Sequence, residues 1–553
     1  MSTVPHIPLF SFRLSCLRPR VAPAVGICIG LLATACSPAS EPAPIPAPIP
    51  VERASIAEVR TAILEGRTTC RMVVQAHLDR IEAYDASTGL GAISEVNPRA
   101  LVQADSLDRA LADHRRGGGD RSAGSAALGP LFCAPLLVKD NFDTHDLPTT
   151  GGSIALAGNL PPRDAFMVRR IREAGAVVVA KTNMAEWAFS PRQTVSSSYG
   201  TTANAYALDR TPAGSSGGTA SGVAAAFGVA GLGSDTGNSI RGPSSHLALV
   251  GIRSTLGLTS RAGVIPLAFD RDVAGPMGRS VEDVARIFTV VAGFDPDDPY
   301  TEAGRGHAHA DYTTFLDPEG LRGRRLGVLR VFADPATGDT AVLARFDQAL
   351  TELAELGAEV VDDVRIPDQA DLLAAGLFCR RFRYDMGVYL ASLGEGAPIR
   401  DVAEVLETGA YGPDAEGGLR SFGSRPLDVH PADDDPPCPD FREHEGRQAL
   451  LEAVLRTMDE AELDALVFPT WSHPPAPLER ANQEYRGDNS QGLIPAAGLP
   501  AITVPMGFTY GNLPAGLQIA GRPWSEGLLF QLAYAYEQGT RHHRPPEGFP
   551  PLP

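Results

Sequence analysis

Two lysines, and two serines in glycine-containing tracts, are the residues of this 553-residue chain that most readily suggest chemistry. Lys139 and Lys181 are its only lysines, although lysine and arginine together number 48. An arginine guanidinium cannot give up its proton in a protein, so a residue that must act as a base cannot be arginine. Ser215 and Ser239 lie in two glycine-rich tracts that follow Lys139. A serine hydroxyl attacks only when a base takes its proton, and a desolvated lysine with a lowered pKa can be that base.

Two other motifs compete with this interpretation. Residues 175–182 almost spell a phosphate-binding loop, but an alanine replaces its second glycine and a run of valines favours a strand. Lys181 is therefore expected to be a structural residue at a strand end. Residues 214–218 also match the GxSxG nucleophile elbow, with Ser216 as the nucleophile. An elbow follows a strand, whereas the five residues before this motif contain a proline and form no apolar run, so we favour the lysine and serine pair.

The order of these motifs resembles that of the amidase signature family. The resemblance spans roughly residues 55–545, and the matching blocks lie at residues 135–141, 181–184, 214–218, 239–241, 251–257, 275–277, 498–505 and 516–519. It implies a hydrolase that cleaves a C–N amide bond. It also implies the family fold, a single large α/β domain in which a twisted mixed β-sheet is covered by α-helices on both sides. A weaker likeness over residues 235–246 is to the bacterial branch of aryl acylamidases, peptide amidases and urethane-cleaving enzymes.

The resemblance assigns a Ser-cisSer-Lys triad to this chain. Ser239 would be the nucleophile that forms an acyl-enzyme, Lys139 the neutral base, and Ser215 the bridging serine next to a cis peptide bond. Ser215 would pass the Ser239 proton to Lys139 and later return it to the departing amine. Such a relay suits amides, because an amine that leaves without a proton is a very poor leaving group.

The resemblance also assigns the groups that stabilise the developing charge. The oxyanion hole would be formed by the backbone N–H groups of Thr236, Gly237, Asn238 and Ser239. Structural support for this turn is expected from Ser216, Asp235 and Arg241. Asn238 departs from the family pattern, which usually has glycine before the nucleophile. Asparagine tolerates a positive φ better than most residues, and its side chain would narrow the pocket.

Apolar periodicity places these motifs on helices and strands. Ser55-Ile56-Ala57-Glu58 fits a capping box and predicts a helix that stops at Gly66. Further helices are expected over about 69–84 and 98–114. From there on, short runs such as 136–138 and 177–179 are apolar on both faces, which is typical of strands covered by helices on both sides. The periodicity therefore also predicts an α/β body.

Residues 296–440 are expected to be a helical and loop insertion in a catalytic domain that extends over 54–550. The stretches 296–320 and 410–440 are rich in Asp, Pro and Gly, which is typical of surface loops. His307, His309 and Asp311 lie in one of them, and the loop setting argues against a metal site there. The chain contains no CxxC or HExxH motif. We therefore expect neither a metal nor an organic cofactor.

The N-terminus predicts export. Arginines precede an apolar stretch at 21–35 that is short for a membrane span, so 1–35 is interpreted as a signal peptide. Residues 32–36 resemble a lipoprotein processing site with Cys36 as the lipid acceptor, and plain cleavage after Ala35 is the alternative. The proline-rich residues 36–53 would form a stiff tether. The mature protein would then lie in the periplasm or on the outer surface, held to the membrane only by this anchor.

An oxidising compartment would permit disulfides among the remaining cysteines, whose spacing does not indicate the pairing. These cysteines are Cys70, Cys133, Cys379 and Cys438. Cys133 lies close to Lys139 in the sequence, and we interpret it as a small buried residue and not as a functional thiol.

Charge and composition limit the class of partner. The net charge of −18, without a dense basic stripe, argues against nucleic acid. The expected partner is a small-molecule amide, ester or carbamate, because esterases and carbamate hydrolases use the same acyl-enzyme chemistry. A different class, a noncatalytic periplasmic binding lipoprotein, is encouraged only by Asn238. The sequence indicates neither the substrate nor the oligomeric state.

Overall fold

The computed structural model describes residues 47–116 and 128–552, and one mixed β-sheet organises them. Within these residues the sheet is 11-stranded, in the order β1-β3-β2-β6-β8-β7-β12-β13-β11-β9-β10. Its strands are β1 (Ile93–Val96), β2 (Pro135–Lys139), β3 (Val177–Thr182), β6 (Ala230–Asp235), β7 (Val250–Arg253), β8 (Val273–Gly278), β9 (Arg325–Val328), β10 (Glu359–Val361), β11 (Ala465–Pro469), β12 (Ala501–Thr509) and β13 (Leu513–Ala520). A separate ribbon pairs β4 (Val195–Ser196) with β5 (Gly200–Thr201).

The central strands are buried on both faces, as their apolar runs predict. β2 pairs in parallel with β3 on one side and with β6 on the other, whereas β6 and β8 are antiparallel. Every residue of β2, β3 and β6 is buried. The register pairs Lys139 with Thr182 and Val138 with Lys181. Since side chains alternate along a strand, the two lysines leave the sheet on opposite faces.

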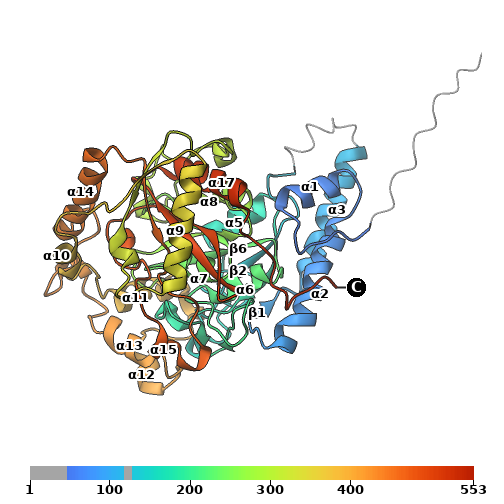
Figure 1. The fold of residues 1–553 in the computed structure, drawn as a ribbon. Coiled ribbons are helices and arrows are strands. Elements are labelled where there is room, and N and C mark those ends of the chain that lie inside the picture. Colours follow the sequence, from blue (N-terminus) through green and yellow to red (C-terminus); the bar gives the residue numbers. More distant parts are fainter. Residues whose placement is uncertain (1–46, 117–127, 553) are drawn as a thin grey trace, which may run out of the picture. The chain divides into compact units, whose positions relative to one another are not determined.

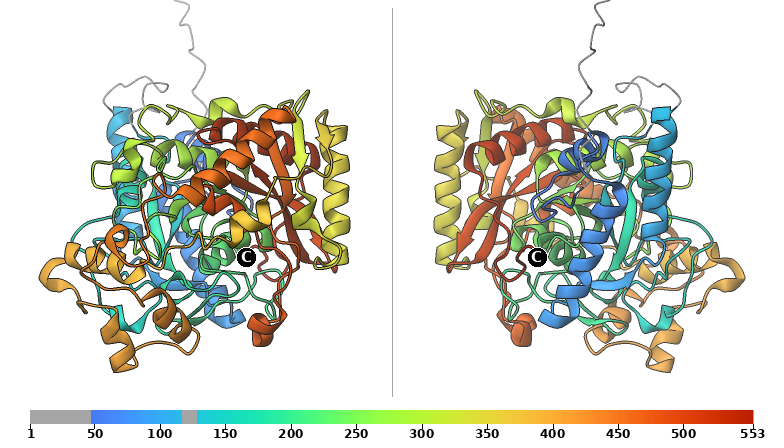
Figure 2. Two further views of the ribbon diagram at one scale, coloured as in Figure 1. Left: turned by 90° about the vertical axis from the view of Figure 1, so that its left-hand side faces the viewer. Right: turned by 90° about the vertical axis from the view of Figure 1, so that its right-hand side faces the viewer.

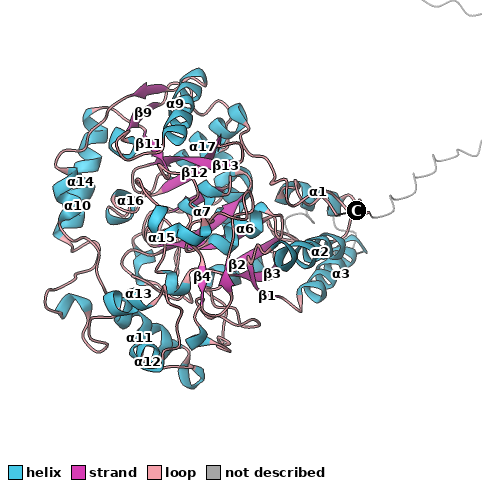
Figure 3. Cartoon of the chain, turned by 60° about the horizontal axis from the view of Figure 1, so that its bottom comes forward, coloured by secondary structure: helices cyan, strands magenta, loops and turns pink. Residues whose placement is uncertain are grey.

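Helices cover both faces of this sheet (Figures 1 and 2). α8, α9 and α17 pack with β12 and β13 in one apolar cluster, while α6 and α7 pack against the sheet from the other side (Figure 3). The longer helices are α1 (Ile56–Leu64), α2 (Cys70–Thr88), α3 (Ala100–Arg116), α5 (Phe166–Glu173), α6 (Gly217–Ala224), α8 (Val281–Val291), α9 (Thr340–Glu355), α11 (Phe382–Ser392), α14 (Glu445–Glu460) and α17 (Glu526–Thr540). The shorter ones are α7 (Arg241–His246), α10 (Gln369–Ala374), α12 (Ala403–Thr408), α13 (Glu416–Phe422), α15 (Ala481–Glu484) and α16 (Leu493–Ala496). The predicted α/β fold with a mixed sheet between helices is confirmed.

The first helix begins and ends as its sequence predicts. The Ser55 side chain accepts from the backbone N–H of Glu58, and the Glu58 carboxylate accepts from the N–H of Ser55, which is the reciprocal pattern of a capping box. Gly66 follows the helix with a φ of 78°. The next two helices, α2 and α3, also lie within a few residues of their predicted bounds.

The expectation of one helical insertion over 296–440 is wrong in its middle part. Residues 325–361 form β9, α9 and β10, and β9 pairs in parallel with β11 of the main sheet. These strands are only three or four residues long, so their apolar runs were too short to recognise. The segment outside the sheet is shorter than predicted and carries α10 to α13.

Part of the predicted tether and all predicted disulfide partners fall within the described residues. Ala47 donates its N–H to the Arg67 carbonyl, and Val51 is buried, so the end of the proline-rich stretch contacts the folded domain. The predicted signal peptide and Cys36 lie outside the described residues. The four described cysteines form two disulfides, Cys70–Cys133 and Cys379–Cys438. None of the described helices has both the length and the apolar character that crossing a membrane requires.

Candidate active site

Lys139 ends strand β2 inside a small group of hydroxyls. Its Nζ lies 2.8 Å from Ser215 Oγ and 2.8 Å from Ser234 Oγ. The side chains of Lys139 and Ser215 are completely buried, and the Gly214–Ser215 peptide bond is cis, the geometry that the family resemblance implies. The strand therefore delivers an amine directly to the predicted bridging serine.

The surroundings of Lys139 favour its neutral form. Burial lowers the pKa of Lys139 to about 7, although the negative charges of Asp235 and Asp272 act in the opposite direction. Neither carboxylate forms a salt bridge with the lysine, because Asp235 is paired with arginines and Asp272 accepts from Thr236. An amine with a pKa near 7 is a mixture of free base and ammonium at neutral pH, which suits a residue that must both accept and return a proton.

Ser239 lies on the turn between β6 and α7. It is 5% exposed, whereas the neighbouring Gly237 is half-buried. Gly233 contacts the residue after the cis serine and the residue after Ser239, because a Cβ at Gly233 would lie 3.0 Å from Ser216 Oγ and 3.3 Å from Ile240 Cγ1. Among the described residues, Ser239 Oγ forms no hydrogen bond, so the structure holds the Lys139–Ser215 pair together and leaves the Ser239 hydroxyl free.

The four predicted oxyanion-hole N–H groups have no hydrogen-bond acceptor in the described part of the chain. The backbone N–H groups of residues 236–239 donate to none of the described acceptors. The turn is instead held from outside, since Asp235 accepts from the Ile240 N–H at 3.2 Å and from the Arg241 guanidinium at 3.1 Å. Unpaired N–H groups on a braced turn can receive a developing negative charge without rearrangement.

A buried ion cluster fixes the ends of that turn. Asp235 lies between Arg241 and Arg253, and all three side chains are completely buried. Burial alone would raise the pKa of Asp235, but the two guanidiniums outweigh it and hold the pKa at about 2. Arg241 also donates to Gln518 Oε1 at 2.8 Å and to Ser490 Oγ at 3.0 Å. The predicted supporting pair of Asp235 and Arg241 is thus the centre of a larger network.

Side chains from other loops contact the same turn. Thr236 Oγ1 donates to Asp272 Oδ1 at 2.5 Å, and Arg271 donates to the Thr236 carbonyl at 3.0 Å. Arg271 also donates to the Gln491 carbonyl at 2.5 Å. The Gln491 carboxamide lies over Gly237, since its Oε1 would be 3.1 Å from a Cβ there. Gly237 therefore leaves room for a side chain from the loop that precedes α16.

Asn238 is accommodated differently from the expectation. It is not among the residues with a positive φ, so the turn does not require asparagine for that reason. Its side chain is completely buried and points along α7, where Nδ2 would be 2.5 Å from a Cβ at Gly242. Trp471 Cε3 also contacts this position, 3.4 Å from a Cβ at Gly242. The chain thus has a glycine at 242 where the asparagine side chain needs space.

Ser216 and Lys181 lie outside the reacting group. Ser216 Oγ donates to the Ser234 carbonyl at 3.2 Å, which supports β6. Within residues 47–116 and 128–552, Ser216 Oγ contacts neither a histidine nor a carboxylate, so the partners of an elbow mechanism are missing there. Lys181 Nζ lies on the other face of the sheet and donates to two carbonyls, those of Phe142 and Pro148, and to two threonine hydroxyls. The predicted structural role of Lys181 therefore fits its contacts.

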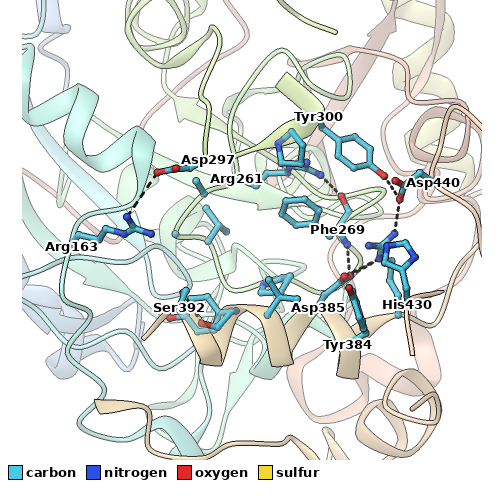
Figure 4. A pocket seen from close by; sticks show the side chains of 18 residues that line it. Arg163, Arg261, Phe269, Asp297, Tyr300, Tyr384, Asp385, Ser392, His430 and Asp440 are labelled. Carbon is cyan, nitrogen blue, oxygen red and sulfur yellow. Dashed lines mark hydrogen bonds and ion pairs between the residues drawn. The ribbon is translucent and has the colours of Figure 1, made fainter. Parts of the chain in front are cut away.

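A pocket of about 340 Å³ lies between α11 and the segments that carry Arg261, Phe269 and Tyr300 (Figure 4). Tyr384, Asp385 and Ser392 extend into it from α11. Its charged groups are already paired, since Arg381 contacts both Asp385 and Asp440 at 2.9 and 3.1 Å. The pocket contains none of the predicted site residues, so its position does not support a role in the chemistry.

Several residues that contribute to the site are not predicted from the sequence. Ser234 contacts Lys139, and Asn141 donates to Ser234 Oγ at 3.0 Å. Arg253, Asp272 and Gln491 contact the turn from distant parts of the chain. A lone serine in a strand carries no signal in one sequence. Asn141 and Arg253 lie in blocks that resemble the family, which was the only indication available for them.

Comparison with known proteins assigns the chain to a family. The sequence profile of the Amidase family matches residues 72–530. A peptide amidase from Stenotrophomonas maltophilia is similar in structure, with a TM-score of 0.77 and 36% identity over 90% of this chain and 99% of that one. A glutamyl-tRNA(Gln) amidotransferase subunit from Symbiobacterium thermophilum is 33% identical over 88% of this chain and 97% of its own length. The predicted resemblance is confirmed, and this chain belongs to the amidase signature family of enzymes that hydrolyse amide C–N bonds.

Proposed function

We propose that the protein hydrolyses small-molecule amides through an acyl-enzyme on Ser239. In this mechanism Ser239 attacks the amide carbonyl carbon while its proton moves to Ser215, whose own proton moves to Lys139. The C–N bond then breaks, and the proton returns through Ser215 to the departing amine. Water releases the acyl group by the same relay in the reverse direction.

The observation that carries this proposal is the contact between Lys139 and Ser215. A buried amine 2.8 Å from a hydroxyl, with its pKa lowered to about 7, can accept the hydroxyl proton near neutral pH. Ser216 and Ile240, the residues that follow Ser215 and Ser239 in the chain, both pack against Gly233. This common contact supports a proton path from Ser239 through Ser215. Ser239 itself keeps some exposure, as a nucleophile requires.

Charge stabilisation is assigned to the backbone of residues 236–239. Their N–H groups have no acceptor among the described residues, and the turn that carries them is braced by Asp235. Removing one donor from such a site typically costs about 2.7–4 kcal/mol of transition-state stabilisation. These N–H groups are therefore expected to contribute more to the rate than any single side chain except those of the triad.

The substrate class is proposed at the level of amides, with aryl acylamides and linear peptide amides as the compounds to try first. Similarity to a protein named peptide amidase supports the second choice. Ester and carbamate hydrolysis need only a different leaving group on the same acyl-enzyme. Initial rates on an anilide and on the phenyl ester with the same acyl group separate these activities, and an amidase should retain substantial turnover of the anilide.

Export and a lipid anchor on Cys36 are proposed together. Pairing of all four described cysteines supports an oxidising compartment, because disulfides persist mainly outside the cytosol. Mass spectrometry of the N-terminal peptide tests the anchor: a diacylglyceryl thioether on Cys36 supports it. An unmodified Cys36 thiol, or a peptide that still contains residues before Cys36, contradicts it.

Adduct mapping tests the nucleophile. A serine-directed fluorophosphonate should label Ser239, and Ser239→Ala should remove the label, whereas Ser216→Ala should leave it in place. A label on Ser216 would establish the elbow mechanism instead. No adduct on a folded protein would favour a noncatalytic binding protein.

A further inference from the structure

Ser234 is the second hydroxyl that contacts Lys139, and the triad does not use it. Its Oγ lies 2.8 Å from Lys139 Nζ and 3.0 Å from Asn141 Nδ2. Ser234 is 6% exposed and lies one residue before Asp235 at the end of β6. The charged groups that act on Lys139 are Asp235 and Asp272, and Asp235 is itself paired with Arg241 and Arg253.

The hydrogen bonds around Ser234 constrain the orientation of the Lys139 amine. An amide nitrogen can only donate, so Asn141 occupies one lone pair of Ser234 Oγ. The orientation of Asn141 is supported by the Ile265 carbonyl, which lies 3.5 Å from the same Nδ2 and can only accept. A neutral Lys139 has two N–H donors and one free electron pair. In the proposed mechanism that electron pair must face Ser215, so Lys139 must donate an N–H to Ser234.

Ser234 then accepts two hydrogen bonds and needs an acceptor for its own proton. If its proton pointed at Lys139 instead, it would occupy the electron pair that Ser215 needs. Among the described residues, Ser234 Oγ has no hydrogen-bond partner other than Lys139 and Asn141. Ser216 contacts only the backbone of Ser234. The acceptor must therefore be something other than these protein groups.

A small cavity beside Ser234 has the properties of a water site. Its volume is about 10 Å³, and its polar lining includes Asn141, Ser234, Thr236 and Asp272. A cavity needs about 10–15 Å³ to hold one water molecule. Asn141 Oδ1, which belongs to a 1% exposed side chain, is buried without a hydrogen-bond partner. A buried acceptor that has lost its water partner without gaining another destabilises the folded state, so a donor is expected at this position.

We propose that this cavity holds one ordered water that accepts a hydrogen bond from the Ser234 hydroxyl and donates one to Asn141 Oδ1. Ser234 then accepts an N–H of Lys139, which turns the electron pair of Lys139 toward Ser215. Ser234 is thus a positioning residue, and no proton is transferred to or from it. The inference rests on the proposed triad and adds a mechanism that keeps the base in its productive orientation.

The test compares two substitutions at Ser234. S234A removes the acceptor, so kcat/KM on an anilide should fall about 10- to 100-fold. The acid limb of the pH profile should move to lower pH, because the ammonium form of Lys139 loses a hydrogen-bond acceptor. S234T keeps the hydroxyl and should return the acid limb to its original position. An unchanged rate in S234A, or a lower rate with an unshifted acid limb, overturns the proposal.

A second measurement keeps the inference testable if S234A does not fold. A crystal structure of the unmodified protein that resolves waters should show one within hydrogen-bond distance of both Ser234 Oγ and Asn141 Oδ1, and its absence overturns the proposal. Fluorophosphonate labelling separates the role of Ser234 from the proposed function. Without label on Ser239 the proposed function itself fails, whereas label on Ser239 with an unchanged S234A profile rejects only the role of Ser234.

Discussion

The two lysines occupy neighbouring parallel strands and are both completely buried, yet their surroundings differ. Lys181 has four oxygen acceptors within 3.2 Å, two of them carbonyls, and lies 3.8 Å from the Asp140 carboxylate. Lys139 has two hydroxyl partners and no salt bridge with a carboxylate among the described residues. Burial lowers the pKa of both lysines.

The difference lies in what each partner can do with a proton. A carbonyl only accepts, so the partners of Lys181 require N–H donors and stabilise the ammonium form. A hydroxyl both donates and accepts, so the partners of Lys139 are compatible with either form. Burial alone therefore does not make a base, because the surrounding groups must also tolerate the neutral amine.

Replacing Lys139 should have the largest effect. Lys139→Ala removes the base, and Lys139→Arg supplies a cation that cannot lose its proton, so kcat should fall about 10²- to 10⁴-fold in both. Steady-state rates on an anilide measure this, with circular dichroism as the control for folding. Near-normal turnover in either variant would remove Lys139 from the mechanism.

Replacing Lys181 should act on stability. Lys181→Met leaves the buried Asp140 carboxylate without its cation, which should lower the free energy of unfolding by about 3–5 kcal/mol. Urea denaturation measures the loss, and the double variant with Asp140→Asn should recover part of it. The folded fraction should keep its kcat; loss of kcat at unchanged stability would mean that the two lysines have been assigned the wrong roles.

The pH profile should report Lys139 and not Lys181. Because the pKa of Lys139 is about 7, kcat/KM should fall toward tenfold per pH unit below pH 7, as the amine gains a proton, and level off above it. The measurement is kcat/KM between about pH 5 and 10, a range that covers the lowered pKa of Lys139 and approaches the ordinary lysine pKa. An acid limb near the ordinary lysine pKa would show that burial does not lower the pKa of Lys139.

Ser216 and Ser215 should differ as Lys181 and Lys139 do, one acting on stability and the other on turnover. The effect on stability should be smaller for Ser216 than for Lys181. Its hydroxyl contacts only the backbone of Ser234, whereas Ser215 contacts Lys139. Ser216→Ala should lower the free energy of unfolding by about 1 kcal/mol, the typical contribution of one hydrogen bond. Thermal denaturation and kcat measure the two effects, and Ser215→Ala is the matched control that should lose turnover. Equal losses of kcat would reject the distinction.

Local sequence signals predicted much of the scaffold. The capping box at Ser55 gave the start of α1, and the apolar runs gave β2 and β3. The resemblance gave Lys139 and Ser215, which the fold brings within hydrogen-bond distance. These features depend on residues close in sequence or on a motif that constrains its own geometry.

Long-range pairings could not be predicted in the same way. Cys379 and Cys438 are partners because a folded loop brings them together, and their spacing does not favour that pairing over others. Ser234 gains a role only because β6 lies beside β2. The strands β9 and β10 were missed because each is too short to show a periodicity, and their place at the edge of the sheet is set by β11.

Direct titration of the two lysines tests the central claim. Because the chain contains only Lys139 and Lys181, isotope labelling of lysine side chains gives two sets of NMR signals, and Lys139→Arg assigns them. We predict that the Lys139 signal titrates with a midpoint near pH 7. A Lys139 signal that remains that of an ammonium group up to pH 10, close to the ordinary lysine pKa of about 10.4, would contradict the account.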